Sequence, residues 1–162
     1  MSAHALPDRR TNAATEKWVF ASCAAQVVIT TVHHVRGALV FDTPGRYHSI
    51  LIALILLAVP ATAYALGRAT TGTRQDVAWW TFWATTLVGF AVVFGAVEGV
   101  TTHVITPVLR RGYPSDEPFD LVFEATGILH ILPAVITATL LIRLARSRRS
   151  PRPDRGVSSP PS

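Results

Sequence analysis

Four long apolar runs divide the chain, and short polar connections separate them. The runs cover roughly residues 18–32, 50–66, 77–97 and 121–142. A helix that crosses a bilayer needs about 20 mostly apolar residues, and three of the runs reach or approach that length. The first run reaches it only if its helix continues from Glu16 or Lys17 through His34. The pattern therefore predicts four transmembrane helices, with spans at about 16–35, 48–67, 77–104 and 120–145.

A soluble four-helix bundle is the alternative to a membrane protein. The helices of such a bundle carry charged residues on their outward faces, at every third or fourth position. The second run, "ILIALILLAVPATAYAL", has no charged residue at all. The predicted fold class is therefore all-α, an integral membrane antiparallel four-helix bundle formed by residues 15–146. Residues 1–14 are predicted to be a disordered tail, and residues 147–162 a disordered, basic and proline-rich tail.

The distribution of basic residues predicts the orientation. Four spans place both termini and the 67–76 connection on one side, and all but four of the 15 Lys and Arg residues lie on that side. The four exceptions are Arg36, Arg46, Arg110 and Arg111. The positive-inside rule then predicts a multi-pass protein of the cell membrane with both termini in the cytoplasm. The basic C-terminal tail is interpreted as an orientation signal with attraction to anionic lipid. Nucleic acid is not an expected partner, because no recognition motif accompanies the charge.

Histidine and acidic residues gather at the opposite, outer ends of the spans. Antiparallel packing brings these ends together, and ionisable groups within a span are costly unless they are paired or functional. We therefore predict one cluster near the outer membrane surface, made of His33 or His34, Glu98, His103, Glu124 and His130. His48 is expected to cap a helix or contact lipid headgroups. The acidic residues Asp116, Glu117 and Asp120 are expected to cap and charge the start of the fourth helix.

Straight α-helices do not bring all of these side chains together. Glu98 and His103 are five residues apart, which separates them by about 140° around an α-helix. Glu124 and His130 are six apart, about 120° in the other direction. A proline in each of the two helices removes one backbone hydrogen bond, and a local kink there would turn the side chains.

Three classes of function stay open. The first is a metal centre, because imidazole and carboxylate groups suit zinc, iron, copper or nickel. Its candidate ligands are His33, His34, His103, His130, Glu98 and Glu124. Haem is less favoured, since it requires two facing histidines at matched depth within the bundle. Cys23 is the only cysteine, which excludes an internal disulfide, a CxxC redox pair and a four-cysteine zinc site.

The second class is a metal-free acid–base enzyme in which Glu98 and Glu124 are the catalytic groups. Four spans with embedded His and Glu resemble the emopamil-binding-protein type of sterol isomerase and small membrane-bound terpene cyclases. The resemblance covers helix number and residue types, and it implies an apolar, lipid-like or isoprenoid substrate. No residue role is transferred from it. The third class is a non-catalytic membrane subunit whose polar residues serve packing alone, and the oligomeric state stays open.

Overall fold

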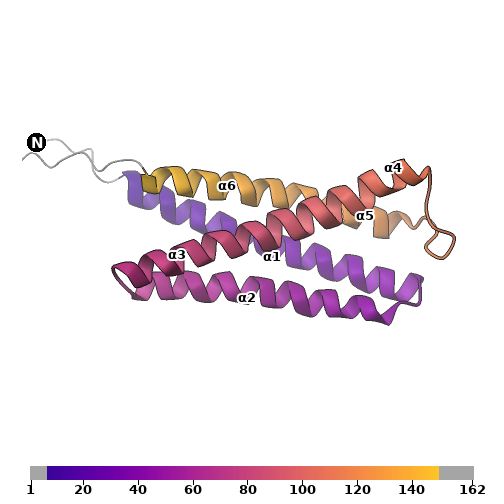
Figure 1. Ribbon diagram of the computed structural model, residues 1–162, viewed down its shortest axis with the longest axis horizontal. Coiled ribbons are helices and arrows are strands. Elements are labelled where there is room, and N and C mark those ends of the chain that lie inside the picture. The colour runs from indigo at the N-terminus through magenta and orange to yellow at the C-terminus, as the bar shows by residue number, and fades with distance from the viewer. Residues whose placement is uncertain (1–6, 150–162) are drawn as a thin grey trace, which may run out of the picture.

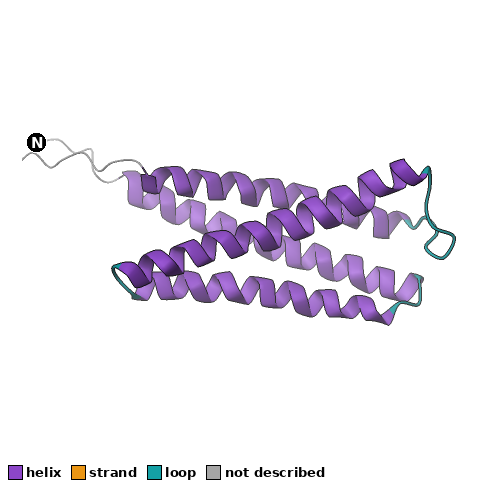
Figure 2. Ribbon diagram, viewed as in Figure 1, coloured by secondary structure: helices purple, strands orange, loops and turns teal. Residues whose placement is uncertain are grey.

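The chain is all-α over the part that the structure, a computed structural model, describes (residues 7–149). Residues 1–6 and 150–162, which include most of the expected C-terminal tail, lie outside the described part. No strand occurs in residues 7–149 (Figures 1 and 2). The elements in chain order are α1 (Pro7–Val40), the 3₁₀-helix η1 (Pro44–Arg46), α2 (Tyr47–Ala69), α3 (Thr73–Thr86), the π-helix η2 (Leu87–Ile105), α4 (Thr106–Arg110), α5 (Leu121–Leu129) and α6 (Ile131–Arg149). The helices α1 and α6 include residues 7–14 and 147–149, which the sequence analysis places in the two tails.

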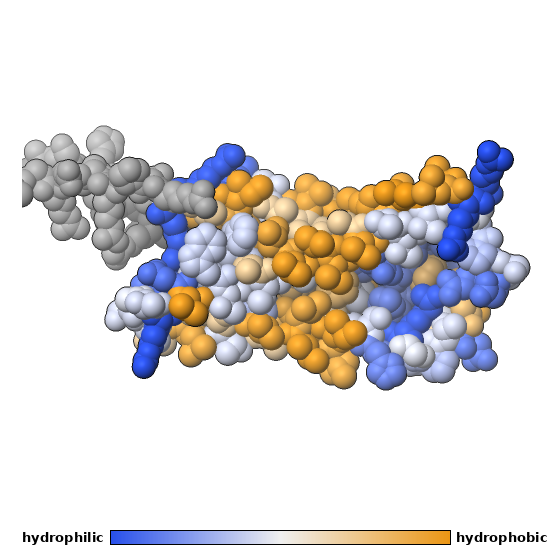
Figure 3. Space-filling model, in the orientation of Figure 1, coloured by the Kyte–Doolittle hydropathy of each residue, from blue (hydrophilic) through white to orange (hydrophobic). Residues whose placement is uncertain are grey.

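Four helical segments are long and apolar enough to cross a membrane, as the sequence predicts. They are Asn12–Val40, Pro44–Ala69, Thr73–Arg110 and Leu121–Arg148. The segments lie lengthwise beside one another, with the 41–46 and 111–120 connections at one end and the 70–72 turn at the other (Figure 1). We call the end with two connections the site end. The visible face is apolar along its middle and polar toward both ends (Figure 3).

Helix α1 is the element that holds the bundle together. It contacts α2, α5 and α6, and it also touches η2. Apolar and polar side chains alternate along the buried face of α1. Its apolar residues Val19 and Cys23 join the core. There they pack with Phe82, Phe90 and Leu141, and all five side chains are 1% exposed or less. This apolar core lies away from the site end, so the polar stripe of α1 is left to face the fourth segment.

The fourth segment is interrupted at His130, where α5 ends and α6 begins. Pro133 has no backbone N–H, so the carbonyl of Leu129 loses its helical hydrogen bond at this point. The interruption agrees with the kink that the proline predicts. It separates the short helix that carries Glu124 from the remainder of the segment.

The third segment departs from the α-helical geometry assumed from the sequence. Over η2 (Leu87–Ile105) it is π-helical, so each backbone N–H bonds the carbonyl five residues earlier instead of four. The hydroxyls of Thr101 and Thr102 also donate to carbonyls five residues earlier. A π-helical turn holds more residues than the 3.6 of an α-helix, so Glu98 and His103 lie about one turn apart. The expected separation of about 140° is therefore wrong, and both side chains reach the same place.

Small residues allow η2 to approach α6 closely. Gly95 is buried, and a Cβ atom placed on it would overlap the Cβ of Ala134. Val92, three residues earlier, lies on a different face of the helix with 44% of its surface exposed. Gly95→Leu should lower stability by about 1–3 kcal/mol or more through overpacking, whereas Val92→Leu should have little effect. Thermal unfolding of both variants in detergent checks this, and equal unfolding temperatures would contradict the packing assignment.

Candidate metal centre

Three side chains from two different segments converge at the site end. His33 of α1 and Glu98 and His103 of η2 each direct one potential ligand atom toward the others, and these atoms all lie within 4.8 Å of one another. Glu98 Oε1 is 3.2 Å from His33 Nε2 and 3.6 Å from His103 Nε2. The two histidines are buried, whereas the Glu98 side chain is 24% exposed. A buried His/Glu cluster is therefore present where the helix ends meet.

The far nitrogen of each of these histidines is held by an oxygen from α5. His33 Nδ1 lies 3.0 Å from the carbonyl oxygen of Phe123 and 3.2 Å from the hydroxyl of Thr126. His103 Nδ1 lies 2.9 Å from Glu124 Oε2. A carbonyl or carboxylate accepts a hydrogen bond, so Nδ1 carries the proton in both rings. When a ring is neutral, its Nε2 atom is left with a lone pair that points toward Glu98.

With both rings neutral, this arrangement places three electron-rich atoms close to one another. Two imidazole lone pairs and a carboxylate oxygen repel unless a positive charge lies among them. A proton on His33 satisfies its contact with Glu98. It leaves His103 Nε2, which is buried and has no hydrogen-bond partner within the described chain. A metal cation satisfies all three atoms at once.

The observed spacing suits metal coordination. Metal–ligand bonds of about 2.0–2.2 Å place neighbouring ligand atoms roughly 3.0–3.6 Å apart, and the two distances to Glu98 Oε1 are 3.2 and 3.6 Å. Two imidazoles and one carboxylate form the ligand set of many catalytic zinc sites and of non-haem iron(II) sites, which keep coordination positions open. The residues present therefore fit either metal.

The other predicted site residues lie close by in different roles. Glu124 is buried and supports the ring of His103. The ring of His34 packs edge-on against His33 with centroids 5.0 Å apart, and its buried Nδ1 has no partner within residues 12–148. His130 uses both nitrogens, since Nδ1 donates to the carbonyl of Thr126 and Nε2 lies 3.1 Å from the hydroxyl of Thr30. His34 and His130 are thus neighbours of the three-atom group.

Haem does not fit between His33 and His130. The rings of His33 and His130 pack edge to face with centroids 5.4 Å apart, which leaves no gap for a macrocycle between them. Both nitrogens of His130 also have partners already. The geometry therefore favours a bare metal ion over haem.

Polar pairs position α1 against the fourth segment. The hydroxyls of Ser22 and Thr137 lie 2.7 Å apart, and the Thr30 hydroxyl contacts His130. All four residues are buried. The pairs fix the axial register of α1 against α5 and α6. His33 lies one turn after Thr30 on the same face of α1. The register that places His33 beside α5 is therefore held by hydrogen bonds deep in the bundle.

A cavity of about 430 Å³ opens beside the cluster. Glu98, His103, His34 and Glu124 line it, together with Arg46 of η1 and Arg110 of α4. The wall is therefore mixed, with charged groups as well as apolar ones. The cavity therefore borders Glu98 and His103, two of the three converging side chains.

Ion pairs close the site end of the helices. Arg36 donates two hydrogen bonds to Asp120, at 2.7 and 3.2 Å, and this guanidinium holds the pKa of Asp120 at about 2. Asp120 also accepts from the backbone N–H of Phe123, so it caps α5 as predicted. Glu117 instead pairs with Arg46. Among residues 12–148, the ion-pair partners of Glu98 and Glu124 are histidines, and no arginine lies within ion-pair distance of either.

His48 does not join the cluster. Its side chain is exposed, and Nδ1 lies 3.0 Å from the carbonyl oxygen of Gly45 at the start of α2. This contact agrees with the local, helix-end role expected from the sequence.

Two contributions to the site were not foreseen. The Phe123 carbonyl is a backbone group, which a sequence does not single out. Gly127 supplies space, because a Cβ atom placed there would overlap the ring of His103. The glycine in the middle of "FEATGILH" was the available signal, since a glycine inside a helix often permits a close approach.

Comparison of the chain with protein-family models, with curated proteins and with solved structures finds no match. The function is therefore argued from the site itself.

Proposed function

We propose that this protein is an integral membrane protein that binds a divalent transition metal through His33, Glu98 and His103. The observation that carries the proposal is the buried Nε2 atom of His103, which has no hydrogen-bond partner among the described residues and lies 3.6 Å from Glu98 Oε1, in one group with His33. A buried polar atom without a partner costs free energy. A cation shared by the three groups removes that cost, and the oxygen contacts to both Nδ1 atoms orient the rings for it.

Membrane insertion is supported by the surface of the helices. In α2 the large apolar residues Leu51, Ile52, Leu54 and Ile55 each have more than half of their surface exposed. Water would penalise so continuous an apolar surface, while lipid tails would not. We propose an antiparallel arrangement of four spans in the cell membrane, with the metal centre near the outer face.

The open side of the metal centre supports a catalytic role. A metal held by three protein ligands keeps positions for water or substrate, and the cavity of about 430 Å³ adjoins them. A bound metal would polarise an oxygen-containing group of the substrate or activate water. The arginines that line the cavity favour a polar or anionic group on that substrate.

A metal-free acid–base enzyme is the second candidate. The partial exposure of Glu98 favours it, because a carboxylate flanked by two imidazoles and open to a cavity is suited to proton transfer. An isoprenoid substrate is less well accommodated, since Arg46, Arg110 and Glu117 line the same cavity. This candidate predicts a protein that keeps its activity after complete removal of metal.

Elemental analysis of the detergent-purified chain tests the metal proposal. We expect about one equivalent of zinc or iron per chain, and an absorption spectrum without a haem Soret band. A protein that contains less than a tenth of an equivalent, and takes up neither zinc nor iron(II) after treatment with chelator, would contradict the proposal.

The orientation is tested by cysteine labelling on intact cells. Cysteine placed at Ser115 should react with a membrane-impermeant maleimide, whereas cysteine placed at Ser2 should react only after the cells are broken. The native Cys23 is buried and should give no background. The expectation rests on the excess of basic residues on the side of both termini. Labelling at position 2 but not at position 115 in intact cells would reverse the orientation.

A further inference from the structure

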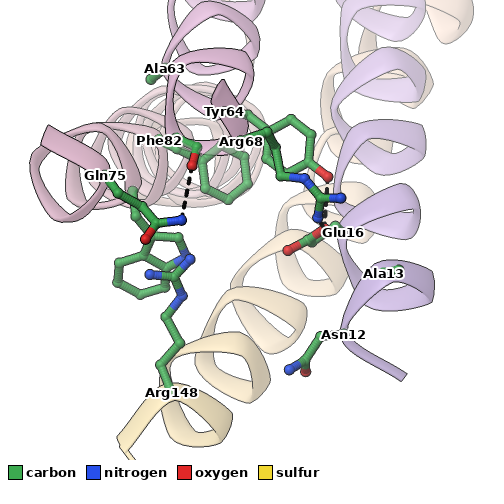
Figure 4. A pocket seen from close by; sticks show the side chains of 11 residues that line it. Asn12, Ala13, Glu16, Ala63, Tyr64, Arg68, Gln75, Phe82 and Arg148 are labelled. Atoms are coloured by element: carbon green, nitrogen blue, oxygen red, sulfur yellow. Dashed lines mark hydrogen bonds and ion pairs between the residues drawn. The ribbon is translucent and has the colours of Figure 1, made fainter. Parts of the chain in front are cut away.

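A second pocket lies at the end of the bundle opposite the metal centre. It has a volume of about 470 Å³ and lies where α1 and α3 begin and α2 and α6 end (Figure 4). Its lining includes Glu16, Tyr64, Arg68, Trp79 and Arg148. We call it the inner pocket. None of the residues of the metal centre takes part in it.

The carboxylate of Glu16 is the acidic group in the lining of the inner pocket. Glu16 Oε2 accepts a hydrogen bond of 2.7 Å from the hydroxyl of Tyr64, and it lies 3.8 Å from a guanidinium nitrogen of Arg68. The carboxylate is therefore already committed to two groups of α2. Figure 4 shows these three side chains drawn together on one side of the pocket.

Arg148 is the charged residue of the pocket that has no ion-pair partner among the described residues. Its guanidinium carbon lies 4.3 Å from the ring centroid of Trp79, and no carboxylate of the described residues is within ion-pair distance of it. In Figure 4 its side chain extends from α6 toward Gln75 and the ring beside it. The described lining of the inner pocket holds two guanidinium groups and one carboxylate. Asp76, in the first turn of α3, does not line the pocket, but Arg148 also lies within its electrostatic field.

The inner pocket is also apolar on its deep side. Phe82 is 1% exposed, Ala63 5% and Trp79 8%. Beside the pocket, Leu66 of α2 and Val77 of α3 are more than half exposed. A ligand with an anionic head and an apolar tail would satisfy both features, with the head at the arginines and the tail along the outer faces of α2 and α3.

We propose that the inner pocket binds the phosphate group of an amphiphile. The guanidinium group matches the geometry of phosphate oxygens and can donate two parallel hydrogen bonds to them. Stacking on Trp79 holds the group in place and leaves its N–H donors available. The proposal rests on membrane insertion and is independent of the metal centre, so each can fail without the other.

Native mass spectrometry of the full-length protein in detergent micelles tests the proposal. The probes are dioleoyl phosphatidic acid, dioleoyl phosphatidylcholine and inorganic phosphate. We expect one bound phosphatidic acid, with binding at least tenfold weaker for phosphatidylcholine, whose headgroup has no net charge. Inorganic phosphate, added at the same concentration, should neither bind nor compete. Equal binding of both lipids, or competition by inorganic phosphate, would overturn the assignment to an anionic amphiphile.

Matched variants locate the binding. Arg148→Gln should weaken binding of phosphatidic acid at least tenfold, and Ala13→Phe should weaken it by filling the pocket from α1 without changing its charge. Arg74→Gln removes an exposed arginine of α3 that does not line the pocket, and it should bind normally. Equal losses in Arg74→Gln and Arg148→Gln would show that surface charge alone attracts the lipid and would overturn the proposal. Metal content should be unchanged in every variant, which separates this test from that of the metal centre.

Discussion

Replacement of His103 by alanine is expected to reduce bound metal from about one equivalent per chain to less than a tenth. His103 supplies the buried Nε2 atom that lacks a hydrogen-bond partner, and a centre of three protein ligands that loses one has only two left to hold the metal. His33→Ala should have the same effect, since His33 Nε2 lies on the other side of Glu98. Elemental analysis and zinc titration of the purified variants measure the loss.

A matched control and a second readout keep this result interpretable. His48→Ala removes an exposed imidazole at the same end of the bundle and should leave metal content unchanged. Metal that binds the folded state alone stabilises it by about 4 kcal/mol at a thousandfold excess over the dissociation constant. Wild type should therefore unfold at a lower temperature after chelation, whereas His103→Ala should not respond to chelator. Full metal occupancy in His103→Ala would remove His103 from the ligand set.

Glu124→Gln is expected to weaken metal binding by about 10–100-fold without abolishing it. Glu124 does not belong to the three-atom group but accepts the hydrogen bond of His103 Nδ1–H. The amide oxygen can still accept that bond, while the negative charge that strengthens the imidazole as a ligand is lost. Excess metal should therefore restore occupancy in Glu124→Gln but not in His103→Ala.

The control for this variant is Glu117→Gln, because Glu117 pairs with Arg46 at the rim of the same cavity. It should bind metal as tightly as wild type. Competition with a chromogenic chelator gives the affinities of the three proteins. A loss in Glu124→Gln as complete as that in His103→Ala, and not reversed by metal, would make Glu124 a direct ligand. Unchanged affinity would leave it with a role in packing only.

The helices could be predicted from the sequence because their signal is local. Four apolar runs separated by polar connections determine four helices, whatever their arrangement. The ends of the helices do not follow from this signal: α1 runs from Pro7 to Val40, whereas the predicted membrane span covers residues 16–35. Apolar length indicates how much of a helix can lie in lipid, but it does not indicate where the helix stops, because helical hydrogen bonding continues into polar residues.

The cluster could be predicted in part. That His33, Glu98, His103 and Glu124 gather at one end follows from their positions in the four runs. The division of roles among them does not. On a regular α-helix Glu98 and His103 point in different directions, and only the π-helical backbone of η2 brings them to one place. Whether a segment is π-helical depends on its packing, and no residue pattern in this run indicates a π-helix.

By itself, the sequence determined that the chain is helical, that it has four segments long enough to cross a bilayer, and that its histidines and carboxylates lie toward one end. These properties depend on composition and spacing along a single segment. The tertiary structure decided which atoms meet: Nε2 of His33 and of His103 at Glu98, with their other nitrogens held by Phe123 and Glu124. It also decided that His130 is committed to Thr30 and Thr126. The physical reason is that a ligand set depends on the rotation and register of separate helices, which are fixed by contacts between residues as many as 115 positions apart.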